Sequence, residues 1–164
     1  MQKLETIPKD KRIYLDESGV NQYLYREYGR SLKGQKVLGE VSGKRFGRQS
    51  VISALLNGKF LAPMCFEGTC DTSVFNNWLK EILIPELKPG QVLILDNASF
   101  HKSPESKKII EAVGCSILFL PPYSPDLNPI EKFWANMKVK MRELLSKGKK
   151  FIESFDGAIL SMSA

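Results

Sequence analysis

Residues 118–134 read LFLPPYSPDLNPIEKFW, and this stretch decides the fold. An apolar strand ends in two prolines, a short polar loop follows, and a helix begins after the loop. Asn128 is a preferred N-cap residue and Pro129 suits the first helical position. Glu131 falls in the first turn, where its carboxylate can reach back to the cap amide or face a bound ligand. The local residues leave both roles of Glu131 open.

Two further carboxylates follow apolar strand patterns. The run Val92–Leu95 leads into Asp96, and the run Arg12–Leu15 leads into Asp16. Strand ends in α/β proteins hold side chains over a crevice, although an aspartate before asparagine is also common in turns. Alternation along a strand puts Asp16 and its neighbour Glu17 on opposite faces, so we expect one of them to join a shared site. Three carboxylates on rigid elements are what a two-metal phosphoryl-transfer site requires.

The composition indicates an ordinary globular protein. The 164 residues are 43% hydrophobic and 26% charged, and we expect a single domain over residues 1–164. The sequence holds no apolar run near the length of roughly 20 residues that crosses a bilayer. The first ten residues carry no signal-peptide core, so we expect a cytoplasmic protein. Three cysteines without metal-site spacing are expected to be reduced thiols.

Hydrophobic patterning predicts an alternating order of elements after an initial β-rich part. The strands are expected over residues 12–17, 36–42, 48–56, 59–66, 91–96 and 116–120, and the helices over 72–87, 104–113 and from 129 onward. Asn57-Gly58 between two apolar runs predicts a β-hairpin. Asp71 is placed to cap the first long helix. By itself, this pattern supports an α/β protein with a mixed sheet.

Basic side chains suggest a polyanionic partner. The chain has 24 Lys and Arg against 18 Asp and Glu, a net charge of +6. Lys138 and Arg142 share the Glu131 side of the predicted helix, and Lys102 follows the Asp96 loop together with Lys107 and Lys108. We expect these cations to contact phosphates, although a solvated helix face explains such runs as well.

His101 is the only histidine in the chain. It can orient Asp96, contact a phosphate or serve in packing, and the sequence leaves these roles open. A serine nucleophile paired with His101 is not expected, because the chain lacks the turn that activates such a serine.

Four motifs taken together carry a family resemblance. Residues 14–19 read YLDESG, residues 28–34 read YGRSLKG, residues 95–101 read LDNASFH, and the fourth motif is residues 120–134. They closely resemble the catalytic domain of DDE transposases of the mariner superfamily, in its bacterial insertion-sequence branch. The resemblance covers roughly residues 10–145. Thirty-four residues separate Asp96 from Glu131, which is the spacing of the superfamily.

The resemblance implies a ribonuclease-H-like α/β fold, in which a mixed central sheet is flanked by helices. It carries the catalytic and metal-binding triad onto Asp16, Asp96 and Glu131. It implies two Mg²⁺ ions, for which Mn²⁺ can substitute, and metal-dependent DNA strand cleavage and strand transfer. Transposon ends and target DNA would be the partners, and the expected assembly is a homodimer. DNA contacts are expected from His101, Lys102, Lys138 and Arg142.

Members of this family carry an N-terminal helix-turn-helix region, and nothing before Asp16 is expected to form one. We therefore expect DNA recognition to come from an upstream reading frame, as a partner or a fusion, unless the chain is a truncated copy. The alternative function is that of a catalytically inactive remnant, which dimerises with a full-length transposase or inhibits it.

Overall fold

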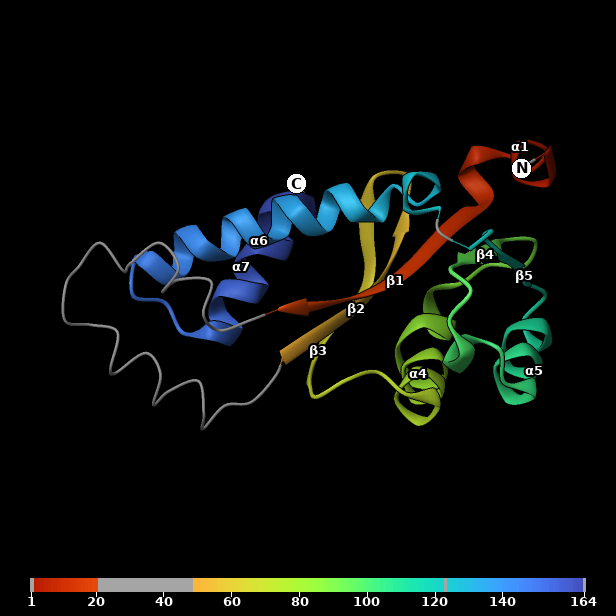
Figure 1. The fold of residues 1–164 in the computed structure, drawn as a ribbon, viewed down its shortest axis with the longest axis horizontal. Coiled ribbons are helices and arrows are strands. Elements are labelled where there is room, and N and C mark those ends of the chain that lie inside the picture. Colours follow the sequence, from red (N-terminus) through yellow and green to blue (C-terminus); the bar gives the residue numbers. More distant parts are fainter. Residues whose placement is uncertain (1, 21–48, 123, 164) are drawn as a thin grey trace. The chain divides into compact units, whose positions relative to one another are not determined.

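The structure is a computed structural model that describes residues 2–20, 49–122 and 124–163. Its strands form one five-stranded sheet in the order β3-β2-β1-β4-β5 (Figure 1). The strands are β1 (Arg12–Val20), β2 (Gln49–Leu56), β3 (Lys59–Glu67), β4 (Val92–Leu95) and β5 (Ser116–Phe119). β1 pairs with β4 in parallel, and β4 pairs with β5 in parallel. The sheet is therefore built outward from β1 in both directions.

Local caps set where the helices begin. The helices of the described residues are α1 (Gln2–Glu5), α4 (Thr72–Trp78), α5 (Pro104–Ala112), α6 (Ile130–Ser146) and α7 (Phe151–Ser163). The Asp71 side chain accepts a hydrogen bond from Val74 N at 2.9 Å and caps α4, as expected. The Ser103 hydroxyl does the same for Ser106 N at the start of α5, at 3.1 Å. α4 continues through a π-helical turn (Leu79–Leu83) and a 3-10 turn (Ile84–Glu86), so the helical run predicted over 72–87 is confirmed.

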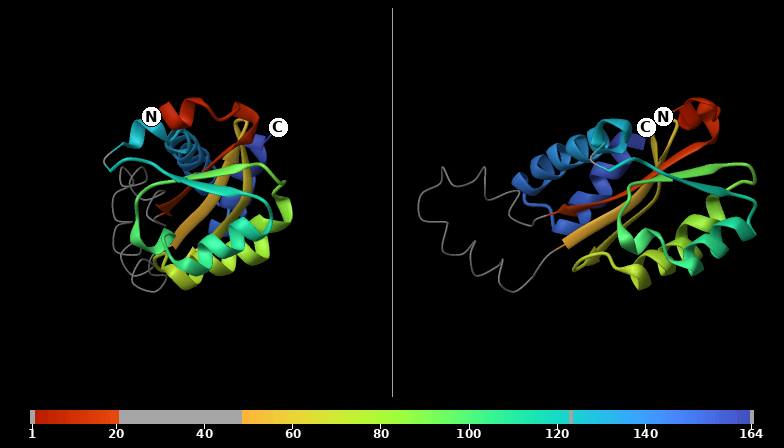
Figure 2. Two further views of the ribbon diagram at one scale, coloured as in Figure 1. Left: turned by 90° about the vertical axis from the view of Figure 1, so that its right-hand side faces the viewer. Right: turned by 45° about the vertical axis from the view of Figure 1, so that its right-hand side comes forward.

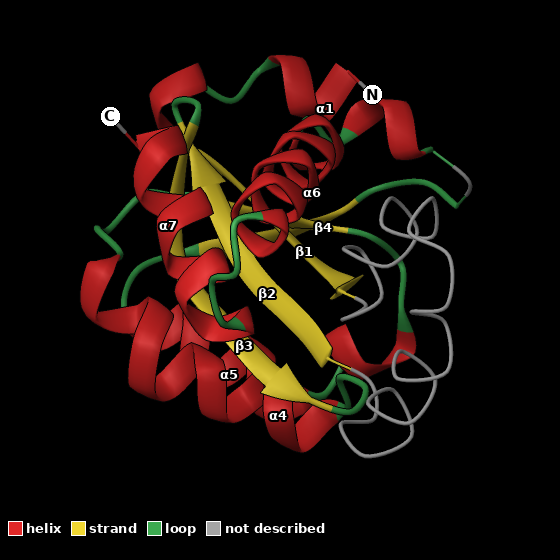
Figure 3. Ribbon diagram, turned by 90° about the vertical axis from the view of Figure 1, so that its left-hand side faces the viewer, coloured by secondary structure: helices red, strands yellow, loops and turns green. Residues whose placement is uncertain are grey.

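The chain forms two compact units. The first consists of Met1–Glu17, Ile52–Met64 and Cys70–Glu131, and the second of Ser18–Val51, Cys65–Thr69 and Lys132–Ala164. In the first unit, α4 and α5 lie side by side (Figure 2). Lys80, in the π-helical turn that follows α4, forms an ion pair with Glu105 of α5 at 2.6 Å. The second unit contains α7 and all of α6 after Glu131 (Figure 3). A Cβ on Gly157 of α7 would lie 2.8 Å from Cδ1 of Leu144 in α6. Glycine at this position therefore permits close packing within the second unit.

The core of the first unit holds the parallel strands rigidly. Leu93, Ile94 and Leu95 of β4 have no exposed surface, and neither do Ile13 and Leu15 of β1. The continuous apolar run of β4 is typical of a parallel strand that is covered on both faces. Because the strands are buried up to the residue before each aspartate, Asp16 and Asp96 are attached to a fixed base.

Most elements predicted from the sequence are confirmed. Asn57 and Gly58 have φ values of 52° and 78°, as a type I′ hairpin turn between β2 and β3 requires. β1 continues to Val20, so Asp16 lies inside the strand. The strand expected over residues 36–42 lies outside the described residues. α7 was not among the elements predicted from the sequence.

Cys65, Cys70 and Cys115 are free thiols, as expected. Within the part of the chain that the structure describes, no helix is both long enough and apolar enough to span a membrane.

Candidate active site

A pocket of about 230 Å³ in the first unit brings together the three carboxylates singled out from the sequence. Asp16 reaches it from β1, Asp96 from the end of β4, and Glu131 from the first turn of α6. The remaining lining residues are Asn97, Leu120, Pro121, Pro122, Ser124 and Asn128. The pocket thus joins three segments that are far apart in the sequence, and residues 118–134 supply most of its wall.

Asp16 is the buried member of the three. Asp16 is only 7% exposed. Its carboxyl is hydrogen-bonded to the carboxyl of Glu131, and such a bond between two carboxyl groups requires a proton on one of them. Burial, the hydrogen bond with Glu131 and the charge of Glu17 together raise the pKa of Asp16 to about 8. The glutamate that could have served as a cap residue is therefore engaged with Asp16 in this structure.

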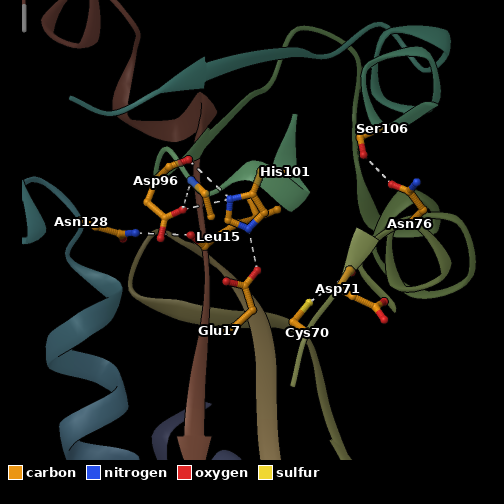
Figure 4. A network of polar contacts seen from close by, with 10 residues as sticks. Leu15, Glu17, Cys70, Asp71, Asn76, Asp96, His101, Ser106 and Asn128 are labelled. Carbon is orange, nitrogen blue, oxygen red and sulfur yellow. Dashed lines mark hydrogen bonds and ion pairs between the residues drawn. The ribbon is translucent and has the colours of Figure 1, made fainter. Parts of the chain in front are cut away.

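Asn128 connects α6 to β1 next to Asp16. Its side-chain amide donates to the Leu15 carbonyl at 3.3 Å (Figure 4), and its side-chain oxygen accepts from Ile130 N at 3.2 Å. The first bond holds β1 and the second satisfies an unpaired amide at the start of α6. A single buried side chain therefore sets the position of Glu131 relative to Asp16.

Asp96 has the opposite electrostatic environment. Its side chain is 53% exposed, and its Oδ1 accepts from Ala98 N at 3.0 Å and forms an ion pair with His101 Nδ1 at 3.0 Å. The hydrogen bond with His101 is the main reason that the pKa of Asp96 lies below its usual value. Asp96 is thus both a turn residue, closing a turn with Ala98, and a carboxylate kept ionised beside the pocket.

His101 lies between two acids. Its Nε2 is 2.7 Å from Glu17 Oε1, while its Nδ1 faces Asp96 (Figure 4). Burial alone would lower the pKa of His101, but the bonds to Asp96 and Glu17 outweigh burial and raise it to about 9. The ring also packs against Phe75 and Phe100, with centroids 4.8 Å and 4.4 Å away. Its side chain has no exposed surface, so His101 orients Asp96 and, in this position, is not available for the DNA contact expected from the sequence.

Two residues of this network were missed by sequence reasoning. Alternation along β1 does put Asp16 and Glu17 on opposite faces of the strand. Glu17 nevertheless contributes to the site, because it bonds to His101, which lies 84 residues away in the chain. Asn128 was expected only as a cap, whereas its bond to Leu15 spans 113 residues. The one feature of the sequence that could have indicated the role of Glu17 is the sole histidine, because a buried imidazole needs hydrogen-bond partners.

The basic residues proposed for DNA contact lie in different places. Lys102, Lys107 and Lys108 are exposed and belong to the first unit, around the start of α5. Lys138 and Arg142 are half-buried and belong to the second unit. Phosphate contact by these side chains remains a prediction.

Carboxylate oxygens are the donors that Mg²⁺ and Mn²⁺ prefer, and this pocket offers three such groups. Among the described residues, no three His, Cys, Asp or Glu side chains converge closely enough to form a complete metal-binding group. In this structure Asp96 faces His101, and Asp16 bonds to Glu131. The donor set fits a divalent cation, whose charge would relieve the crowding that raises the pKa of Asp16.

Comparison with known families gives one match over most of the chain. The sequence model of the family described as DDE superfamily endonuclease matches residues 11–152. An uncharacterized protein of Sinorhizobium fredii, y4pE/y4sA, is 39% identical over 70 residues, which make up 42% of this chain and 50% of that protein. The chain therefore matches about half the length of this curated relative.

Three solved structures share the fold at low sequence identity. A chain of the simian T-cell lymphotropic virus intasome, in complex with the PP2A regulatory subunit B56 gamma, has a TM-score of 0.65, 12% identity and coverage of 94% of this chain and 48% of that one. The catalytic core domain of BIV integrase has a TM-score of 0.61, 10% identity and coverage of 93% and 82%. The Mos1 transposase catalytic domain, solved with raltegravir and Mn, has a TM-score of 0.57, 10% identity and coverage of 99% and 88%. The expected ribonuclease-H-like fold is confirmed.

Replacing Asp16 by asparagine should stabilise the metal-free protein at high pH. An ordinary aspartate loses its proton at about pH 4, whereas Asp16 in the folded protein keeps its proton until about pH 8. Between these values the unfolded chain binds fewer protons, so this carboxyl lowers the free energy of unfolding as pH rises, by up to about 1.4 kcal/mol per pH unit. Urea unfolding in EDTA at pH 5 and pH 8 should show a smaller loss of stability for Asp16→Asn than for the wild type. An equal loss would contradict the burial argument, and Asp10→Asn at an exposed position is the control.

The single imidazole makes the Glu17–His101 contact directly measurable. The NMR signal of His101 should titrate near pH 9 in the wild type and at lower pH in Glu17→Gln, because one of its two acidic partners is lost. Since the folded pKa is raised, the stabilisation by protonated His101 is complete below about pH 6.5 and disappears as pH rises through about 9. The exposed variant Glu5→Gln should leave the titration unchanged. A wild-type midpoint at the ordinary histidine value would refute the contact.

Proposed function

Because the chain belongs to the DDE superfamily endonucleases, we propose that it cleaves DNA at the ends of a mobile element and joins those ends to target DNA. Asp16, Asp96 and Glu131 are the proposed catalytic carboxylates. The observation that carries the proposal is that these three side chains, from β1, β4 and α6, line one pocket. Their elements are held by a buried core and by Asn128, so the acids are presented on a rigid base, as such chemistry requires.

The same carboxylates are proposed to hold two Mg²⁺ ions, with Mn²⁺ able to substitute. When bound, these cations would lower the pKa of the attacking water or 3′-hydroxyl and stabilise the departing oxygen. His101 and Glu17 contribute by keeping the Asp96 carboxylate ionised and oriented. Asn128 contributes by holding the start of α6, and therefore Glu131, beside β1.

DNA is the proposed partner, consistent with the family and with the net charge of +6. Lys102, Lys138 and Arg142 are proposed to contact phosphates, which positions DNA without reading its sequence. Recognition of the element ends is proposed to come from a helix-turn-helix region, as a partner or a fusion. The working assembly is proposed to be a homodimer in the bacterial cytoplasm. Placement in the bacterial insertion-sequence branch of the mariner superfamily is part of this proposal, and the relative matched over 70 residues comes from a bacterium, Sinorhizobium fredii.

The alternative of an inactive remnant is not favoured. The family match extends over residues 11–152 and includes all three acids. These acids also line one pocket.

A divalent cation should stabilise the wild-type protein through these carboxylates. Mg²⁺ or Mn²⁺ should raise the melting temperature of the wild type, because binding to the folded state adds to its stability. Asp96→Asn keeps the size of the side chain but removes a proposed ligand, so its melting temperature should rise less. The exposed variant Asp126→Asn should respond like the wild type. Equal shifts for the wild type and Asp96→Asn would exclude a shared metal site.

The role of Glu131 can be separated from a purely structural one. Glu131→Gln can still hydrogen-bond to Asp16, so the melting temperature should change little. Strand cleavage of a duplex that carries the terminal repeat should fall by more than about a hundredfold, which is the upper range for loss of a residue outside the ligand shell. The expected control is Glu143→Gln on the same helix, with full cleavage. Retained cleavage by Glu131→Gln would return Glu131 to a structural role.

A further inference from the structure

A second and larger pocket of the first unit has no role in the function proposed above. Its volume is about 730 Å³, and it lies between α5 and β5. Its wall includes Ile117 and Phe119 of β5, Lys107 and Glu111 of α5, and Lys102 from the turn before α5. A volume of this size is ordinary for a site that takes a small organic group.

The secondary structure explains why these side chains converge. Ile117 and Phe119 are two residues apart on a strand, so they lie on the same face of β5. Lys107 and Glu111 are four residues apart on a helix, so they lie on the same side of α5. The pocket therefore has an apolar floor from the strand and a charged wall from the helix.

A lysine lies over the ring of Phe119 in this structure. Phe119 is half-buried on β5, the edge strand of the sheet, and Lys102 Nζ lies 5.5 Å from the centroid of its ring. An aromatic face that accepts a cation can also accept a flat nucleobase, and every base offers such a face. A base that stacks on this ring displaces Lys102 from it, and the lysine then pairs with the phosphate of the same nucleotide.

The pocket is adjacent to the carboxylate site. Phe119 pairs in register with Leu95, the residue that precedes Asp96. The residues from His101 to Pro104 line this pocket, and the buried His101 side chain bonds to the Asp96 carboxylate. Phe119 and Asp96 therefore lie at the same end of the sheet but, by the alternation of side chains along a strand, on opposite faces. A DNA strand held at Asp96 would pass around this end of the sheet to bring a neighbouring nucleotide to Phe119.

We propose that this pocket binds one unpaired nucleotide of the DNA strand that passes the carboxylates. Its base stacks on Phe119, and its phosphate is held by Lys102 and Lys107. Glu111 opposes a phosphate on its side of the pocket, so the phosphate lies toward Lys102. That the ligand is DNA rests on the proposed function, but the stacking itself needs neither metal nor cleavage.

Fluorescence of 2-aminopurine tests the stacking in EDTA, where cleavage does not occur. A single-stranded oligonucleotide that contains this base should be quenched on binding to the wild-type chain, whereas a fully paired duplex should be quenched much less. Phe119→Leu keeps an apolar side chain but removes the ring, so quenching should disappear and binding should weaken roughly tenfold. Phe119→Tyr should restore both, which separates loss of stacking from a folding defect.

The other variants separate charge from stacking. Lys107→Met should flatten the dependence of binding on salt by about one unit while the quenching persists. Phe151→Leu, the same substitution in the second unit, should leave the quenching unchanged. Binding to Asp16→Asn should also quench the 2-aminopurine fluorescence, because the stacking does not use the carboxylate site.

Two outcomes would overturn the proposal. One is unchanged quenching and affinity in Phe119→Leu, and the other is binding of the oligonucleotide by the wild type without quenching. If quenching follows the expected pattern but Mg²⁺ or Mn²⁺ shifts the melting temperature of the wild type and Asp96→Asn equally, the nucleotide pocket stands and the proposed metal site fails. The two proposals are therefore tested by separate readouts.

Discussion

The burial of the Asp16 carboxyl next to other acids is the constraint on which the site depends. Removing a carboxylate from water is costly unless a partner compensates it, and in this structure the compensation is a hydrogen bond with Glu131. The apolar residues of β1 and β4 fix the position of Asp16, and Asn128 fixes the start of the helix that carries Glu131. Packing elsewhere in the first unit thus maintains an arrangement that the acids alone would not adopt. Such a cost is typical of functional sites.

Two carboxyls of the same pocket are driven to opposite protonation states. Burial and neighbouring acids raise the pKa of Asp16, whereas His101 lowers the pKa of Asp96. This difference comes from the arrangement around β1, because adjacent residues of that strand serve the site from two sides. Asp16 faces the pocket directly, and Glu17 acts on Asp96 through His101. Separated pKa values are a common property of catalytic carboxylates, and they agree with the endonuclease family of this chain.

The sequence by itself determined the features that depend on neighbouring residues. The caps Asp71 and Asn128, the Asn57-Gly58 turn and the apolar strands before Asp16 and Asp96 all follow from interactions within a few residues. The spacing of Asp96 and Glu131, with the motifs around them, was sufficient to identify the family and the fold. The helix α7 at the C-terminus was not among the predicted elements.

Contacts between side chains that are distant in the sequence depend on the tertiary structure. The bond between Glu17 and His101 and the bond between Asn128 and Leu15 join residues 84 and 113 positions apart, and no local pattern specifies such contacts. The tertiary structure also decided the protonation states, because a pKa depends on burial and on charges brought near by folding. The pocket between α5 and β5 has the same origin, since Phe119 and Lys107 each have an ordinary place in their own element. Local chemistry therefore specifies the elements, and the packing of strands against helices specifies the site.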